Sequence, residues 1–263
     1  MHTGPRIHSL LLLHMDQATE ASLARVIADV EAERTTADLL RDQVKAFDRA
    51  QRMVAMQLGQ VHTLPPSQLA AHQAAVERSF VDVRTSLAAL AKQVPHGEVY
   101  KWADVWSFPM RNAVYAASLA YYLGAGRLLS KEAAAIVLGV DMLPADCMLL
   151  TTEDYLHGLI SMVNELPRLA IHAVTHGDFD APVRIADMVK QVHAAFQVLN
   201  LKNDALRKRF DSLKYDVKRV EEILYDIRLR DLQGRTDMPL GLAVVVPEAE
   251  AAALLQRLAG RAA

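Results

Sequence analysis

The sequence between residues 203 and 233 is NDALRKRFDSLKYDVKRVEEILYDIRLRDLQ. Its apolar side chains recur at alternating intervals of four and three residues, and they are Leu206, Phe210, Leu213, Val217, Val220, Leu224 and Ile227. This spacing keeps one seam of an α-helix facing a partner helix, as in a coiled coil. Charged residues flank the seam, where they can fix the orientation of that partner. The stretch therefore predicts a long helix with a helix-packing face.

The partner of this seam is either another subunit or another helix of the same chain. The repeat covers about three heptads, near the lower limit for a coiled coil. We interpret the seam as an oligomer interface, and burial within the chain is the alternative.

Long helices are also predicted for the rest of the chain. Hydrophobic residues make up 52% of the sequence, which has only 11 glycines and 10 prolines, and no stretch shows sustained strand alternation. We predict an all-α fold, a bundle of about seven long helices, with an all-helical domain over residues 1–234 and a partly irregular C-terminal extension over residues 235–263. Proline, glycine and capping residues place the helices at 16–62, 67–94, 99–129, 130–139, 152–176, 182–199, 203–233 and 248–258.

Charge and cysteine content restrict the possible ligands and the cellular compartment of the protein. The formal net charge of -2 gives no global basic field, so a polyanion must be bound by a local patch. The single cysteine, Cys147, excludes an intramolecular disulfide and fits a reducing compartment. The apolar run at residues 10–13 is too short to span a bilayer, and we interpret it as the start of a core helix. We expect no membrane association and a location in the cytoplasm or nucleus.

A local basic patch lies at the start of the last long helix. Its cations are Lys202, Arg207, Lys208, Arg209, Lys214 and Lys218. On a helix, Arg207, Lys214 and Lys218 fall near one face, where they could contact successive backbone phosphates. Acidic residues are interleaved with the cations, so a solvated charged face is the competing interpretation.

The residues of this region resemble the translin family. The match covers LNLKNDALRKRFDSLKYDVK at 199–218 and VEEILYDIRLR at 220–230, with further matches at 100–106, 153–156, 164–166 and 174–178. The resemblance implies an all-α subunit of a hollow octamer that binds single-stranded DNA and RNA. It also implies a partner, translin-associated factor X, with which translin forms a nuclease that helps to load small interfering RNA.

The sequence departs from the family pattern in two basic segments. Residues 69–77 are nearly free of cations, and Ala103, Val105 and Ser107 stand where histidine, histidine and arginine are expected, although Lys101 remains. Trp102 and Trp106 could stack on bases, or they could belong to the core. The predicted nucleic-acid contacts are Lys101, Trp102, Arg111, Lys202, Arg207, Lys208, Arg209, Lys214 and Lys218.

Metal-dependent cleavage of RNA needs clustered carboxylates to hold Mg²⁺ and orient a water molecule. The resemblance implies that the four acidic positions of the partner correspond to Asn112, Tyr115, Ser161 and Glu165, of which only Glu165 is acidic. We therefore predict a non-catalytic subunit without a cofactor of its own, Mg²⁺ being relevant only in complex with a catalytic partner. The alternatives are an endoribonuclease in its own right and a structural scaffold. We expect Glu165 to form an ion pair, for example with Arg168.

A zinc site is the remaining metal hypothesis. His172 and His176 are four residues apart and are followed by Asp178 and Asp180, a spacing that can hold Zn²⁺. Histidine near the end of a helix is also favoured by the helix dipole. We therefore predict no metal at this position.

Overall fold

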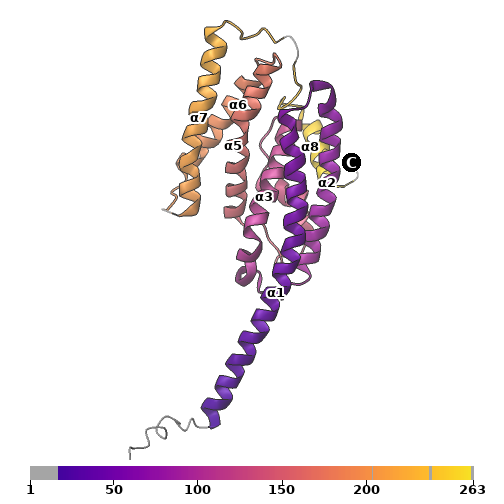
Figure 1. Cartoon of the computed structure of the whole chain (residues 1–263), viewed down its shortest axis with the longest axis vertical. Helices are drawn as coiled ribbons and strands as arrows, with labels where there is room; N and C mark the ends of the chain where they lie inside the picture. Colours follow the sequence, from indigo (N-terminus) through magenta and orange to yellow (C-terminus); the bar gives the residue numbers. More distant parts are fainter. Residues whose placement is uncertain (1–16, 203, 237–238, 262–263) are drawn as a thin grey trace, which may run out of the picture. The chain divides into compact units, whose positions relative to one another are not determined.

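The computed structural model of the chain describes residues 17–202, 204–236 and 239–261 (Figure 1). The α-helices in these ranges are α1 (Gln17–Gly59), α2 (Pro66–Ala91), α3 (Val99–Ala125), α4 (Lys131–Leu138), α5 (Thr152–Thr175), α6 (Ala181–Val198), α7 (Ala205–Leu229) and α8 (Glu248–Leu258). Two short 3₁₀ helices, η1 (Gln60–His62) and η2 (Val140–Met142), follow α1 and α4.

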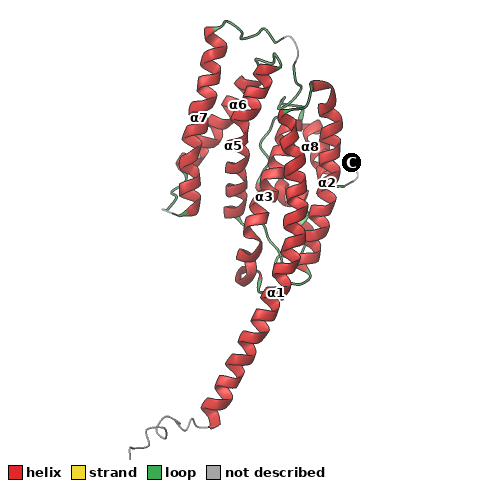
Figure 2. Ribbon diagram, in the orientation of Figure 1, coloured by secondary structure: helices red, strands yellow, loops and turns green. Residues whose placement is uncertain are grey.

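The predicted all-α class is confirmed, because no β-strand occurs among the described residues (Figure 2). Residues 10–13, predicted as the start of a core helix, lie outside the described ranges. Within those ranges, none of the helices combines the length and the hydropathy needed to span a bilayer.

Local capping explains where the helices begin and end. Ser130, at the start of the helix predicted over residues 130–139, caps α4, its hydroxyl accepting from the N–H of Ala133 at 3.1 Å. The cap of α5 is Thr151, whose hydroxyl accepts from the N–H of Asp154 at 3.0 Å. The last long helix ends at Leu229, four residues before the predicted end at residue 233, and Asp231 then adopts a left-handed conformation with φ 54°.

The chain divides into two compact units, Met1–Leu39 and Leu40–Ala263. Helix α1 runs across this boundary. In the second unit, α5 packs against α3, α6 and α7, and α8 packs against α2, α3 and α4 (Figure 1). This order brings the first residues of α7 beside α5, and the acidic start of α5 beside α3.

The close approach of α3 and α5 depends on a missing side chain at Gly158. A Cβ atom built at Gly158 would lie 2.6 Å from the side chain of Val114 and 2.8 Å from the carbonyl oxygen of Arg111. Alanines of α3, among them Ala113 and Ala117, are buried as well. The two helices therefore meet at short range, which aligns Arg111 on α3 with the carboxylates at the start of α5.

The C-terminal segment closes the ends of earlier helices. The N–H groups of Ala243 and Val246 donate to the carbonyl oxygens of Leu123 and Ala125, at 3.0 and 3.3 Å, and so satisfy the last turn of α3. The guanidinium of Arg84 on α2 donates to the carbonyl oxygens of Val137 at 3.2 Å and Leu258 at 2.5 Å, where α4 and α8 end. Residues 239–261 are thus bonded into the fold.

Candidate nucleic-acid interface

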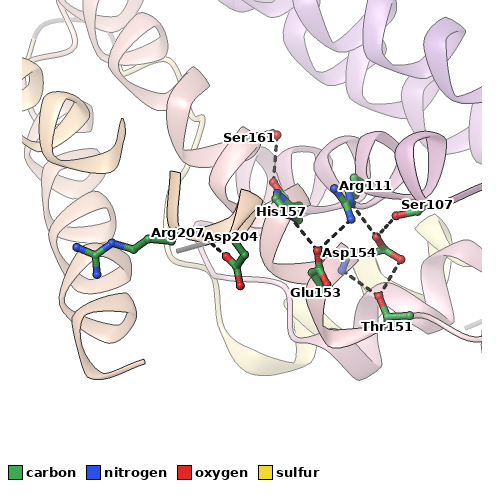
Figure 3. A network of polar contacts seen from close by, with 9 residues as sticks. All are labelled: Ser107, Arg111, Thr151, Glu153, Asp154, His157, Ser161, Asp204 and Arg207. Carbon is green, nitrogen blue, oxygen red and sulfur yellow. Dashed lines mark hydrogen bonds and ion pairs between the residues drawn. The ribbon is translucent and has the colours of Figure 1, made fainter. Parts of the chain in front are cut away.

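The start of α7 carries exposed cations of the predicted interface. Asp204 caps the helix by accepting from the N–H of Arg207 at 2.9 Å, and the Arg207 side chain points away from α5 (Figure 3). Its guanidinium lies 3.6 Å from Asp211, one turn further along. Lys202 and Lys208 are also exposed. Among the described residues, neither lysine has a carboxylate within ion-pair distance.

The same face continues along α7 with Lys214 and Lys218. Lys214 is exposed and lies 5.2 Å from the ring centre of Tyr215, and Lys218 lies 3.9 Å from Glu222. Ion pairs between exposed side chains at such distances contribute about 0.5 kcal/mol each. They can therefore be exchanged for phosphate contacts at little cost.

Arg209 has a different role from its neighbours. Its Nη2 donates to the hydroxyl of Ser161 at 2.8 Å and lies 3.5 Å from the amide oxygen of Asn164. Both partners are on α5, so Arg209 joins α7 to α5. Its assignment as a phosphate contact stays a prediction, and in this structure its Nη2 is bonded to α5.

Arg111 is held in a polar network between α3 and α5 (Figure 3). Its Nε donates to the buried carboxylate of Asp154 at 2.8 Å, and its Nη2 donates to Glu153 at 3.2 Å. The hydroxyls of Ser107 and Thr151 also donate to Asp154, at 2.6 and 2.8 Å. Two carboxylates thus balance the charge of Arg111, and its assignment as a nucleic-acid contact stays a prediction.

Trp102 and Trp106 belong to the core, as one of the two interpretations allowed. Trp102 is 8% exposed, and its indole N–H donates to Glu98 at 2.9 Å. Lys101 lies 3.8 Å from the same carboxylate and 5.2 Å from the indole ring. The prediction that Trp102 contacts bases is corrected, because its ring is covered.

Sequence reasoning missed the exposed aromatic residues of α3. Tyr100 and Phe108 are 80% and 67% exposed, and their separation of eight residues brings them near one side of the helix. Arg111 follows one turn after Phe108 on that side. The signal in the sequence was this spacing, offset from the positions of the two tryptophans.

The seam of α7 lies mainly against its own chain. Leu206, Phe210, Leu213, Val220 and Ile227 are buried, and α7 packs against α5 and α6. The Phe210 ring stacks on that of Phe196, with ring centres 5.8 Å apart. We correct the interface prediction for these five positions, because they have little free surface. Val217 and Leu224 are half-buried, and for them it stays a prediction.

Among the four positions that the family resemblance relates to acids of the partner, Ser161 and Glu165 make side-chain contacts within the chain. Glu165 lies 2.6 Å from Nε2 of His62 and 3.5 Å from Arg168, so the expected contact with Arg168 is present and His62 is a closer partner. The contact with His62 lowers the pKa of Glu165 despite its partial burial. Burial and the charge of Glu165 raise the pKa of Tyr115 to about 12, which keeps the phenol neutral.

His172 and His176 lie together at the end of α5. Their ring centres are 4.3 Å apart, and His62 lies at right angles to His172 at 6.4 Å. Among the described residues, no group of three or more histidines, cysteines or acids has the arrangement of a metal site.

Comparison with known proteins relates the fold to a family. A model of the family described as the Translin family matches residues 35–231. Translin of Gallus gallus is 40% identical over 153 residues, 58% of this chain and 67% of that protein. Translin of Mus musculus is 33% identical over 216 residues, 80% of this chain and 92% of that protein. A solved structure described as "Structure of AfC3PO - duplex RNA complex" matches with a TM-score of 0.56 and 14% identity, over 81% of this chain and 99% of that one.

Proposed function

This chain belongs to the translin family, and we propose that it is a non-catalytic, oligomeric subunit that binds single-stranded DNA and RNA. The observation that carries this proposal is the exposed face of α7 formed by Arg207, Lys214 and Lys218, hereafter the α7 cation face. Its three side chains are exposed, and the ion pairs that two of them make lie within α7 at 3.6 and 3.9 Å. Counterion release from bound phosphates would favour nucleic acid at such a face.

The proposed absence of catalysis rests on the four aligned positions. Asn112, Tyr115 and Ser161 carry no carboxylate, and Glu165 is held by His62 and Arg168. A single carboxylate that already contacts His62 and Arg168 is poorly suited to bind Mg²⁺, because Mg²⁺ sites use several oxygen ligands. We assign the cleavage of RNA to a partner of the translin-associated factor X type, in a nuclease that supports small-RNA silencing. The family resemblance supports an octamer located in the cytoplasm and nucleus.

The test of nucleic-acid binding uses matched charge removal. A variant with Arg207, Lys214 and Lys218 replaced by glutamine is compared with a control in which the exposed Lys45, Arg49 and Lys92 are replaced in the same way. Electrophoretic shifts with single-stranded RNA are measured over a range of salt. The α7 variant should bind more weakly, with a logarithmic salt slope lower by about 2, because each lost phosphate contact removes about 0.7.

The control variant should keep the affinity and the salt slope of the wild type. Duplex RNA serves as the competitor in the same assay, since the solved structure with a similar fold contains duplex RNA. Equal affinity of the wild type and the α7 variant for single strands would move the binding surface away from α7. Sedimentation checks that both variants assemble like the wild type.

Catalysis is tested separately. Purified chain and a mixture with the factor X partner are incubated with RNA and Mg²⁺. Only the mixture should cleave, and Glu165→Gln in this chain should leave its rate unchanged. Cleavage by the purified chain that Glu165→Gln abolishes would show an endoribonuclease in its own right, whereas partner binding without nucleic-acid binding would show a scaffold.

A further inference from the structure

The first half of α1 has an exposed apolar stripe. Leu23, Val26, Ile27 and Val30 are 48%, 53%, 50% and 59% exposed, and their spacing places them on one side of the helix. These positions, hereafter the α1 stripe, lie in the unit Met1–Leu39. The stripe lies before residue 35, where the match to the family begins. It is thus a feature of this chain outside the family-matched region.

The α1 stripe continues a heptad register that is used for packing later in the same helix. Leu40, Phe47 and Val54 are seven residues apart and fully buried. Val26 lies two heptads before Leu40, in the same register, and Val30 follows Val26 by four residues. Glu33 interrupts this register between Val26 and Leu40. Apart from that position, the shared register indicates that the helix presents a seam to a helical partner along this length as well.

We infer that the α1 stripe binds the α1 stripe of a second copy of the chain, with the two helices antiparallel about a two-fold axis. In the register that places Val26 against the partner's Val30, each Val30 also meets the partner's Val26, as an isologous interface requires. Ile27 lies on one flank of the seam, next to Val26, and on that flank it comes beside the partner's Ile27. Four apolar side chains from each copy are removed from water.

Charge complementarity favours this register and direction. Arg34 falls opposite the partner's Glu20, and the two-fold axis repeats this attraction. A parallel pair in register would instead place Glu33 against the partner's Glu33 inside the seam, where two like charges repel. The antiparallel register separates these two carboxylates, because each then lies beside the partner's Leu23. Asp29 meets the partner's Asp29 in the antiparallel pair, but at the exposed edge, where water and salt weaken the repulsion.

The direction of the pair can be read from disulfide formation. In a chain with Cys147→Ser, Val26→Cys and Val30→Cys are made separately and co-expressed with tags of different mass. The antiparallel pair brings position 26 of one copy against position 30 of the other, so mild oxidation should give a disulfide-linked product of mixed mass. Each variant expressed alone should give little product, because like positions are then displaced by about 6 Å along the helix.

The control places the cysteines on the opposite side of the helix. Ala21→Cys and Thr35→Cys, co-expressed in the same background, should give no linked product. Linked product from Val26→Cys or Val30→Cys expressed alone, or no product from the mixture, would overturn the antiparallel pair. Binding of single-stranded RNA by the same preparations is measured in parallel. Loss of RNA binding would count against the α7 cation face and would leave the pairing of the α1 stripes unaffected.

Discussion

The backbone N–H of Leu240 donates to the buried carboxylate of Asp178 at 2.9 Å, across 62 residues of sequence. The other oxygen of Asp178 accepts from the N–H groups of Asp180 and Ala181 at the start of α6, at 3.1 and 2.9 Å. Asp178 is 0% exposed, and Arg184 lies 4.0 Å away. One carboxylate thus joins the C-terminal segment to the first turn of α6.

Asp178→Ala should destabilise the fold strongly. The change leaves three N–H donors without their acceptor, two of them in buried hydrogen bonds. Each buried donor costs about 1–3 kcal/mol when unpaired. We expect a loss of about 3 kcal/mol or more in the free energy of unfolding, measured by urea denaturation. Asp180→Ala is the control, because the Asp180 side chain makes no capping hydrogen bond to α6. Equal stability of the two variants would contradict the role of Asp178.

Gly158→Ala should separate α3 from α5. The added Cβ would meet Val114 at 2.6 Å and the backbone oxygen of Arg111 at 2.8 Å, so one helix has to shift. Overpacking of this kind costs about 1–3 kcal/mol, which thermal unfolding can measure. The matched change Gly59→Ala meets nothing within 4 Å and should be neutral or slightly stabilising. A Gly158→Ala variant as stable as wild type would mean that the α3–α5 contact yields easily.

Stability should fall as the pH drops below about 6.5, the ordinary pKa of histidine. Burial, with smaller contributions from His176 and His62, lowers the pKa of His172 in the folded state. The unfolded chain then binds the proton more tightly, so the stabilisation present above the unfolded pKa is lost as the pH falls toward the folded one.

Urea denaturation between pH 5 and 8 measures this dependence. His172→Gln should reduce the slope of unfolding free energy against pH without removing it, because burial also lowers the pKa values of His72 and His157. The exposed His96 gives the control, His96→Gln. An unchanged slope in His172→Gln would show that His172 takes up its proton without cost.

Tyr100 and Phe108 should contribute to the binding of single strands by stacking on bases. Replacing both with leucine should weaken binding of single-stranded RNA, since one stacked base contributes about 1–3 kcal/mol. Binding of duplex RNA should change little, because paired bases are not free to stack. Fluorescence anisotropy measures both affinities.

Tyr225→Leu is the control for this stacking prediction, since Tyr225 is similarly exposed but lies near the far end of α7. If the double variant binds single strands as the wild type does, the exposed side of α3 serves another purpose, such as contact between subunits.

Several features followed from the sequence by itself. Helix positions could be predicted because apolar periodicity, capping residues and breakers act over a few residues. The family could also be recognised, because residues 199–230 keep a long and specific order of residue types. Non-acidic residues at three of the four aligned positions were evident without any structure.

Tertiary packing decided the roles of individual side chains. Arg207 and Arg209 are two residues apart in one basic run, yet one faces solvent and the other bonds to α5, because a helix turns by about 200° over two residues. Trp102 and Phe108 likewise share α3 but lie on its covered and exposed sides. Only the packing of α3 and α7 against α5 fixes which side is covered, since it depends on contacts between residues far apart in the chain.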